Sequence, residues 1–297
     1  MATVYVIILT RNRRDDLIEC IGSVLKATYA NKEVIVVDNA STDGTEEAIK
    51  ELFPRVELIE TGENLGFARG NNIGIRRALE KGADFILLLN DDTVVDPPFI
   101  DELLRVAERD ESIGVVGPRV YYYSDPKRLW ATGDQDCIGK MDDGTHEEIK
   151  EVPWVVGCAF FMRRQVAEKA GLLDEEMFLY CEEDEYCARI RKAGFRMYYA
   201  PKSVVYHKAS LQGDHLKPYQ VYYNCRNSIL VRRKKYMGLR FYASMANYLL
   251  IVAPKYAYRH VRAGRNHLLP FVYMGVRDGV LWCLGLKPAG QNKDLTP

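Results

Sequence analysis

The sequence predicts an α/β protein with a mostly parallel, Rossmann-like sheet, flanking helices and a mainly helical C-terminal appendage. Three observations lead to this class. Short apolar runs alternate with segments of helical periodicity over residues 4–89, and strand–helix–strand repetition is typical of parallel sheets. Polar residues follow each apolar run where a strand would end. After about Leu211 the composition changes, and aromatic and basic residues interleave in a helical pattern.

The first elements follow from this alternation. Val4–Leu9 is a continuous apolar run, as expected of a strand buried on both faces. Apolar residues then recur at helical spacing from Asp15 to Ala27. Further strands are expected at 34–37, 56–59 and 85–89, and helices at 45–52 and 68–81. Ligands of such sheets bind beyond the carboxyl ends of the strands. We expect four polar strand ends to converge there: Thr10-Arg11-Asn12, Asp38-Asn39, Thr61 to Asn64, and Asn90-Asp91-Asp92.

The second half has weaker periodicity. Residues 118–154 are expected to form a loop or hairpin excursion. Beyond it, the pattern predicts a strand at 155–162, helices at 166–170 and 183–193, and extended stretches at 197–199 and 204–206.

Composition excludes several function classes. The formal net charge is +0, so no global field attracts nucleic acid or a membrane. The 7 cysteines form no CxxC pair, which favours reduced, buried thiols over a disulfide framework or a zinc site. The N-terminal apolar run indicates a first strand rather than a signal peptide, and no apolar run is long enough to span a bilayer.

Adjacent carboxylates follow the buried strand at 85–89. A carboxylate in this place is held rigidly and faces the ligand crevice. Mg²⁺ and similar hard cations bind one or two carboxylates together with substrate phosphates. Asp92, alone or with Asp91, is therefore predicted to hold a divalent metal against a diphosphate. The alternative is a turn or helix cap, because Asp and Asn favour both.

Two other strand ends fit a nucleotide. Asp38 can accept hydrogen bonds from a base N–H or a ribose hydroxyl. The stretch "TGENLGFARGNNIG" has glycines that permit close backbone approach. Neither a P-loop nor a GxGxxG after the first strand is present. A haloacid-dehalogenase-type phosphatase is disfavoured, because Asn90 stands where its nucleophilic Asp would be.

Taken together, these segments resemble the inverting glycosyltransferases of family 2, which have the GT-A fold. The resemblance covers about residues 3 to 210 and is greatest to rhamnosyltransferase-like members that build bacterial and archaeal surface polysaccharides. It rests on six segments in order: "VIILTRNRRDDLIECIGSVL", "VIVVDNASTDGT", "ENLGFARGNNIG", "LLLNDDTVVDP", "VGCAFFMRR" and "GLLDEEMFLYCEEDEYCARIRKAGFRMYYAPKSVVYH".

The resemblance implies sugar transfer from a UDP- or dTDP-sugar to a glycan or lipid-linked acceptor, with Mn²⁺ or Mg²⁺ as cofactor. It implies a catalytic domain at 1–212, divided into a nucleotide-sugar half at 1–117 and an acceptor half at 118–212, followed by a helical region at 213–297. The positions that match nucleotide-binding residues are Thr10, Arg11, Asn12, Asp38, Asn39, Asn64, Gly66, Arg69, Asn71, Asn90 and Asp91. Those that match metal ligands are Asp92 and His207, and those on the acceptor side are Trp154, Gly157, Cys158 and Asp174.

The family's catalytic base lies in an "ED" pair just before a helix. Inverting transfer needs a base that removes the proton of the attacking hydroxyl. Glu183 stands in the usual Asp position and is the expected base, with Glu182 and Asp184 as alternatives. A purely structural alternative is an acidic helix start that favours the helix dipole. Because Glu replaces Asp, the alternative function is a catalytically silent relative that binds nucleotide sugar or scaffolds an assembly.

The C-terminal region has two interpretations. Residues 241–254 are uncharged, and basic residues precede and follow them. A basic, aromatic, amphipathic segment over 230–286 suits a membrane surface. The alternative is a helical subdomain that only packs on the catalytic domain or on the second copy of a homodimer. We expect a cytoplasmic protein that does not bind nucleic acid and, with membrane contact, lies at the inner face of the cell membrane.

Overall fold

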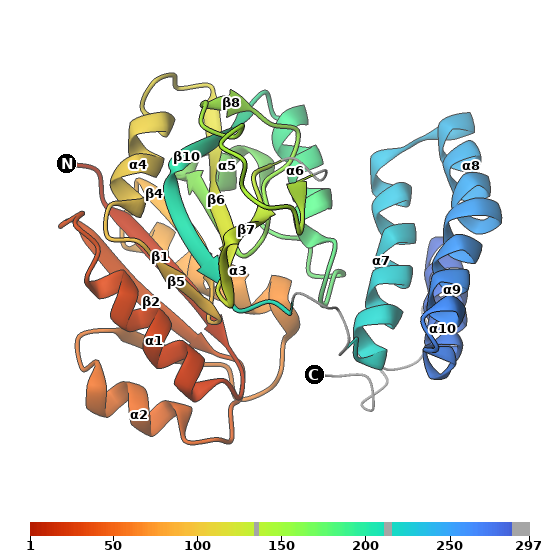
Figure 1. The fold of residues 1–297 in the computed structure, drawn as a ribbon, viewed down its shortest axis with the longest axis horizontal. Helices are drawn as coiled ribbons and strands as arrows, with labels where there is room; N and C mark the ends of the chain where they lie inside the picture. The colour runs from red at the N-terminus through yellow and green to blue at the C-terminus, as the bar shows by residue number, and fades with distance from the viewer. Residues whose placement is uncertain (134–136, 211–215, 287–297) are drawn as a thin grey trace. The chain divides into compact units, whose positions relative to one another are not determined.

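The computed structural model describes residues 1–133, 137–210 and 216–286. The chain forms two compact units (Figure 1). One comprises Met1–Glu175 and Tyr186–Leu211, and the other Glu176–Glu185 and Gln212–Pro297. The expected boundary at 212/213 lies outside the described residues. Residues 176–185 group with the C-terminal helices, an arrangement that the sequence did not predict.

One mixed sheet organises the first unit. Within the described residues, its ten strands have the order β3-β2-β1-β4-β9-β6-β10-β5, with β7 beside β6 and β8 beside β10. The strands are β1 Val4–Thr10, β2 Lys32–Asp38, β3 Glu57–Glu60, β4 Phe85–Asn90, β5 Thr93–Val95, β6 Ile113–Tyr122, β7 Asp125–Ala131, β8 Lys150–Glu151, β9 Ala159–Arg163 and β10 Arg196–His207. The pairings give β1, β2, β3, β4, β6 and β10 one direction and the other four strands the opposite one. The prediction of a mostly parallel sheet is confirmed.

Strand register brings the polar strand ends together. Thr10 is paired with Asp38 and Leu9 with Asn90, so β1, β2 and β4 end side by side. β9 runs against β4 and begins where β4 ends, and the backbone N–H of Asn90 donates to the Cys158 carbonyl at 2.9 Å. The last residue of β10, His207, is paired with Thr93.

Helices cover both faces of this sheet (Figure 1). They are α1 Arg14–Leu25, α2 Thr45–Leu52, α3 Gly66–Glu80, α4 Phe99–Ala107, α5 Arg164–Ala170 and α6 Glu182–Lys192. Alternate residues of β1 enter two separate cores, Val6 with α1 and α4 on one face and Ile7 with α3 on the other. This confirms a strand buried on both faces. A Cβ at Gly74 of α3 would lie only 2.4 Å from Ile7, so glycine permits the close approach of helix and sheet.

The structure corrects two of the expected strands. The strand expected at 155–162 begins only at Ala159, because the chain before it turns into the core through Val155 and Val156. The stretches expected at 197–199 and 204–206 are one strand, β10, with an irregularity in its pairing with β6 between Ala200 and Val204. The expected hairpin excursion is confirmed by the antiparallel pairing of β6 with β7.

The second unit is helical, as the sequence predicted. It contains α7 Pro218–Lys235, α8 Gly238–Asn247, the π-helical turn η2 Tyr248–Val252, α9 Ala253–Arg262, the 3₁₀ turn η3 Asn266–Leu268 and α10 Leu269–Cys283. α7 and α10 pack so closely at Gly275 that a Cβ there would lie 2.4 Å from the carbonyl oxygen of Tyr222. In the part of the chain that the structure describes, no helix has the length and apolar character needed to cross a bilayer.

Candidate active site

Asp91 lies buried where β1 and β4 end. Its Oδ2 accepts a hydrogen bond from the Thr10 hydroxyl at 2.8 Å, and both side chains are largely removed from solvent. Burial, followed by the negative charge of Asp92, raises the pKa of Asp91 to about 7. The site therefore holds one carboxyl group that, in the absence of a cation, keeps its proton up to about neutral pH.

Asp92 is held in the opposite state. Its Oδ1 lies 3.1 Å from Nε2 of His207, and its Oδ2 accepts a hydrogen bond from Arg13 at 2.8 Å. Burial acts to raise the pKa of Asp92, but the His207 hydrogen bond and the charges of His207 and Arg13 outweigh it and lower the pKa to about 2. Asp92 is thus a permanently charged carboxylate, and strands β4 and β10 position the pair formed with His207.

The donor set at this point fits a divalent cation. A carboxylate oxygen and an imidazole nitrogen 3.1 Å apart can bind one ion from two sides. No cluster of three or more His, Cys, Asp or Glu side chains suited to a metal occurs among the described residues. Two protein ligands leave the other coordination positions open, which is typical of Mg²⁺ or Mn²⁺ held jointly with substrate phosphates.

The loops after β1 and β2 are joined by hydrogen bonds. Asn12 has a φ of 52°, and its side-chain oxygen accepts the backbone N–H of Thr42 at 2.7 Å. The backbone N–H of Asn12 donates to the Ser41 hydroxyl at 2.9 Å. Asp38 accepts the backbone N–H of Ser41 at 3.1 Å. These contacts stiffen the rim of the crevice, since each loop is fastened to the other.

The loop after β3 is fastened in the same way. Asn39 donates to the Asn64 side chain at 3.0 Å and accepts the backbone N–H of Leu65 at 2.8 Å. Two buried nitrogens, Nδ2 of Asn64 in this loop and Nε of Arg11 after β1, have no hydrogen-bond partner within the described residues. Buried donors in native proteins nearly always have a hydrogen-bond partner, so both nitrogens are available to a ligand.

Two expected nucleotide-binding residues make their contacts elsewhere. Asn71 donates to the Phe67 carbonyl at 3.0 Å within α3. Arg69, on the same helix, lies 3.9 Å from the Glu175 carboxylate. The structure gives neither residue a contact with the strand-end carboxylates in its described part.

The expected acceptor residues are divided between the strand end and the core. Gly157 is partly exposed and Cys158 is buried, and both immediately precede β9, beside Asn90. Trp154 is partly exposed and packs against both cores, and its indole N–H is buried without a partner in the described residues. Asp174 is partly exposed next to Glu175.

The expected base opens helix α6. Glu182, Glu183 and Asp184 form its first turn and belong to the second unit. Glu182 and Glu183 each have one buried carboxylate oxygen without a hydrogen-bond partner among the described residues. Burial raises the pKa of both carboxyl groups. The charges of Glu183 and Asp184 raise the pKa of Glu182 further. The charge of Asp184 does the same for Glu183. A carboxyl group whose pKa is raised in this way is a good proton acceptor near neutral pH.

Arg13 and Lys208 are residues of this site that the sequence did not identify. Arg13 contacts Asp92, and the backbone N–H of Lys208 donates to the Asp92 carbonyl at 2.9 Å. The Lys208 ammonium pairs with Asp16 and Glu19, both at 2.6 Å. For Arg13, the available signal was the run of basic residues after β1, of which only Arg11 was predicted to bind the nucleotide.

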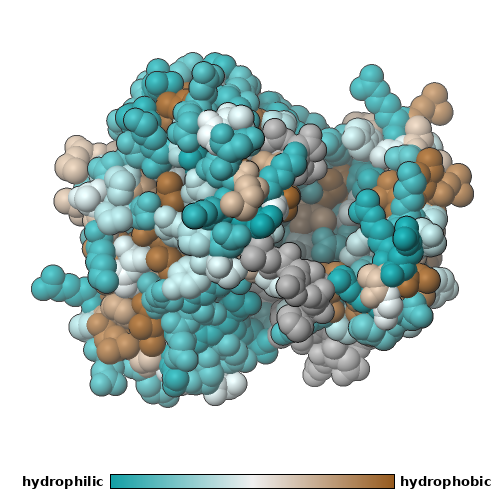
Figure 2. Space-filling model, viewed as in Figure 1, coloured by the Kyte–Doolittle hydropathy of each residue, from teal (hydrophilic) through white to brown (hydrophobic). Residues whose placement is uncertain are grey.

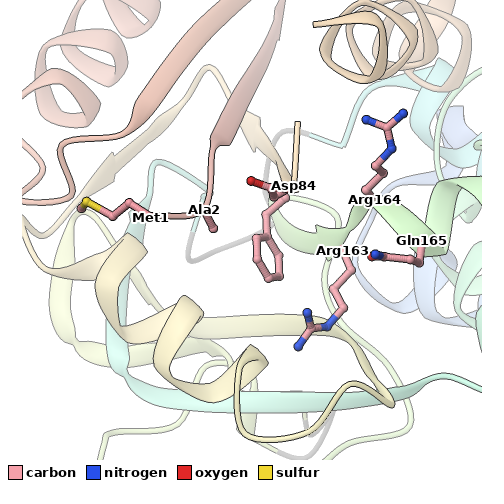
Figure 3. A pocket seen from close by; sticks show the side chains of 7 residues that line it. Met1, Ala2, Asp84, Arg163, Arg164 and Gln165 are labelled. Atoms are coloured by element: carbon pink, nitrogen blue, oxygen red, sulfur yellow. The ribbon is translucent and has the colours of Figure 1, made fainter. Parts of the chain in front are cut away.

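A separate pocket lies at the opposite end of β4 from Asn90. Asp84, Arg163 and Gln165 contribute to it, at the start of β4 and the end of β9 (Figure 3). β4 has 6 residues and therefore separates this pocket from Asn90 by about 20 Å. It is consequently not part of the strand-end site.

Comparisons with known proteins give the family and the fold of this chain. The model of glycosyl transferase family 2 matches residues 5–171. The chain is 28% identical over 224 residues to N-acetylglucosaminyl-diphospho-decaprenol L-rhamnosyltransferase of Mycobacterium tuberculosis, covering 65% of this chain and 72% of that protein. It is 26% identical over 250 residues to dTDP-rhamnosyl transferase RfbF of Shigella flexneri, covering 80% and 82%. Among solved structures, mannosyltransferase PcManGT from Pyrobaculum calidifontis, in complex with GDP-Man and Mn²⁺, matches with a TM-score of 0.59 and 17% identity over 93% of this chain and 86% of that one. This likeness confirms the GT-A fold.

Proposed function

Because this chain belongs to glycosyl transferase family 2 and is a glycosyltransferase of the hexosyltransferase type, we propose that it transfers a sugar, with inversion, from a UDP- or dTDP-sugar to a glycan or lipid-linked acceptor. The observation that carries the proposal is the Asp92–His207 pair at the converging strand ends, with Arg13 on the other oxygen of Asp92. The product would enter surface-polysaccharide biosynthesis.

The strand-end residues bind the donor. Asp38 accepts hydrogen bonds from the base or ribose, and the unpartnered nitrogens of Arg11 and Asn64 donate to the nucleotide. Asp92 and His207 would hold Mn²⁺ or Mg²⁺, and the charge of the ion would stabilise the leaving diphosphate. Arg13 supplies a guanidinium that can pair with phosphate oxygens.

Glu183 accepts the proton of the acceptor hydroxyl. The hydroxyl oxygen then forms a bond to the anomeric carbon, while the bond from that carbon to the diphosphate oxygen breaks on the opposite face. The pKa of Glu183, raised by its burial, keeps the carboxylate basic enough for this role near neutral pH. Cys158 and Gly157, which lie beside Asn90, border the place where an acceptor reaches the donor sugar.

Calorimetry and turnover test this function together. Wild type and Asp92→Asn are titrated with UDP, dTDP, GDP and CMP, with and without Mn²⁺. Turnover is measured with dTDP-rhamnose and a prenyl-diphospho-N-acetylglucosamine acceptor. We expect one diphosphate to bind more tightly with Mn²⁺ in wild type only. Asp15→Asn, an exposed carboxylate on α1, is the matched control. No metal-dependent binding by the folded wild type would contradict the proposal, and binding without any turnover would favour a catalytically silent relative.

We further propose that the helical unit contacts the inner face of the cell membrane. Residues 216–286 contain twelve Lys and Arg but one acidic residue, Asp278, although the whole chain has a net charge of +0. Lys255, Arg259 and Arg262 are exposed at helical spacing on α9. Leu239 and Leu250 are exposed to 87% and 76% on the same continuous run of helix. Brown apolar atoms lie beside teal hydrophilic ones over α8 in Figure 2. This combination suits an anionic lipid surface.

Vesicle sedimentation tests the membrane contact. Wild-type protein is mixed with vesicles of phosphatidylcholine alone or with added phosphatidylglycerol. Each basic residue near an anionic surface contributes about 1 kcal/mol, so replacing Lys255, Arg259 and Arg262 by Ala is expected to weaken binding about a hundredfold. Leu250→Glu is expected to weaken it further through loss of apolar burial. Equal binding to both vesicle types, or a dimer that forms through this face without lipid, would contradict the proposal.

A further inference from the structure

The segment that leads to the proposed base has an unusual backbone. Tyr180 and Cys181 both have a φ of 68°, although neither is glycine. Consecutive residues other than glycine in the left-handed region are uncommon and persist only where surrounding contacts enforce them. The next residue is Glu182, the first of α6. The direction in which the acidic first turn points is therefore set by whatever holds Tyr180 and Cys181.

One buried amide on α7 holds this segment. Asn227 is 0% exposed, and its Nδ2 donates to the carbonyl oxygens of Leu179 at 2.8 Å and of Tyr180 at 2.7 Å. Both amide hydrogens are thus used on consecutive peptide groups immediately before the base segment. A carboxylate of the same shape could make neither bond, because it has no hydrogen to donate.

Arg226 binds both Asn227 and the same segment, and these two side chains form a clamp. Its Nε donates to Oδ1 of Asn227 at 2.9 Å, and its Nη2 donates to the carbonyl oxygen of Glu176 at 2.7 Å. Its guanidinium lies 5.0 Å from the ring centroid of Tyr223 and 5.3 Å from that of Trp282. Arg226 is 4% exposed, so its guanidinium is buried among these partners rather than solvated. Together the two side chains bind three carbonyl groups of residues 176–180.

The helix that carries the clamp is itself fixed. A Cβ at Gly279 of α10 would lie 3.0 Å from the carbonyl oxygen of Arg226, so the two helix backbones nearly touch. The Tyr222 hydroxyl on α7 donates to Asp278 on α10 at 2.9 Å. Contacts therefore run from α10 through α7 and the clamp to the first turn of α6.

We propose that Asn227, supported by Arg226, is a positioning residue that orients the carboxylate of Glu183 for proton transfer. This inference rests on the proposed function, because it takes Glu183 as the base. Asn227 touches neither the donor nor the acceptor in this account. Its effect is on the geometry of proton transfer, where small displacements reduce rates steeply.

Steady-state kinetics of Asn227→Asp and Asn227→Ala test the proposal. We expect kcat to fall about a hundredfold, while KM for the donor and Kd for the nucleoside diphosphate change less than threefold. Tyr248→Phe is the matched control, because it removes a buried hydrogen bond to the same helix, at the Cys225 carbonyl, and Tyr248 packs in a cluster that contains no residue of 176–180. We expect it to lower stability and to leave kcat unchanged. If neither Asn227 variant folds, Arg226→Lys replaces them, because it keeps the charge and loses the fork of donors.

A double-mutant cycle separates positioning from general stability. In a Glu183→Gln background, Asn227→Asp is expected to change kcat less than threefold, since the base on which it acts is already gone. A further hundredfold loss in that background would overturn the inference, as would full kcat in Asn227→Asp alone. A wild-type protein without turnover would instead refute the proposed function, so the two failures are distinguishable.

Discussion

Asp91→Asn is expected to stabilise the metal-free protein, because the native site holds Asp91 in unfavourable surroundings. Its pKa is raised from the ordinary 3.8 to about 7 by burial and by the charge of Asp92. The unfolded chain is therefore ionised between these pH values while the folded chain still holds the proton. Stability that is fully present below pH 3.8 is lost as the pH rises towards 7.

The magnitude follows from the same values. At about 1.4 kcal/mol for each pH unit, a carboxyl group with these two pKa values costs the folded state about 1.7 kcal/mol at pH ~5 and about 4 kcal/mol at pH ~8. Asparagine does not ionise and removes the cost at both. The stabilising effect of Asp91→Asn is thus expected to grow by about 2.5 kcal/mol between the two pH values.

Urea unfolding in EDTA at the two pH values measures this difference. Asp92→Asn serves as the matched variant, because His207 and Arg13 hold the pKa of Asp92 at about 2. That carboxylate stabilises the fold at pH values above its ordinary pKa, so its loss is expected to destabilise by about 2 kcal/mol at pH ~5. At pH ~8 the destabilisation is expected to be smaller, because the charge that helps to raise the pKa of Asp91 is gone. A pH-independent effect of Asp91→Asn, or destabilisation by it at pH ~8, would refute the burial argument.

Three further predictions concern activity and packing. Glu183→Gln should lower kcat by a factor of about 10²–10⁴ without changing nucleotide affinity. In wild type, kcat should fall as the pH drops below about 7, where Glu183 takes up a proton. A wild-type pH profile that is flat from pH ~5 to ~8 would exclude Glu183 as the base. Arg13→Ala should weaken diphosphate binding about tenfold by calorimetry, because a charge-assisted contact is lost, and Arg14→Ala, whose guanidinium pairs with the exposed Asp15, should not. Gly275→Ala should lower the melting temperature, because its Cβ would lie 2.4 Å from a backbone oxygen of α7, whereas Gly22→Ala, with open space around it and no left-handed backbone, should not.

The parallel half of the sheet was predicted well, because its strands are buried on both faces and therefore appear in the sequence as continuous apolar runs. Val4–Thr10 and Phe85–Asn90 agree with the predicted strands to within one residue. Periodicity failed at β9 and β10, where pairing geometry rather than residue type decides where a strand begins and whether it continues through an irregularity.

The candidate site was predicted at the level of strand ends. Thr10 meets Asp91 because the parallel strands β1 and β4 end together in register. His207 meets Asp92 because β10 pairs antiparallel with β5, which places His207 opposite Thr93. The part played by Arg13 could not be predicted, since its contact with Asp92 spans 79 residues and depends on the place where α1 begins. The clamp formed by Asn227 and Arg226 also depends on contacts between residues far apart in the sequence. It could not be predicted, because an asparagine in an aromatic-rich helix gives no local signal of the carbonyl groups that it binds.

The grouping of residues 176–185 with the C-terminal helices has an evolutionary consequence. A tail that only anchored the protein could be lost or exchanged for another without effect on turnover. Here the amide that holds the segment before Glu182 is encoded almost fifty residues downstream, at Asn227. On the role proposed for Asn227, recombination that exchanges the tail would yield an inactive chimera unless the incoming tail brings an equivalent of this residue. Selection on catalysis should accordingly preserve a stretch of helix whose surface is free to diverge.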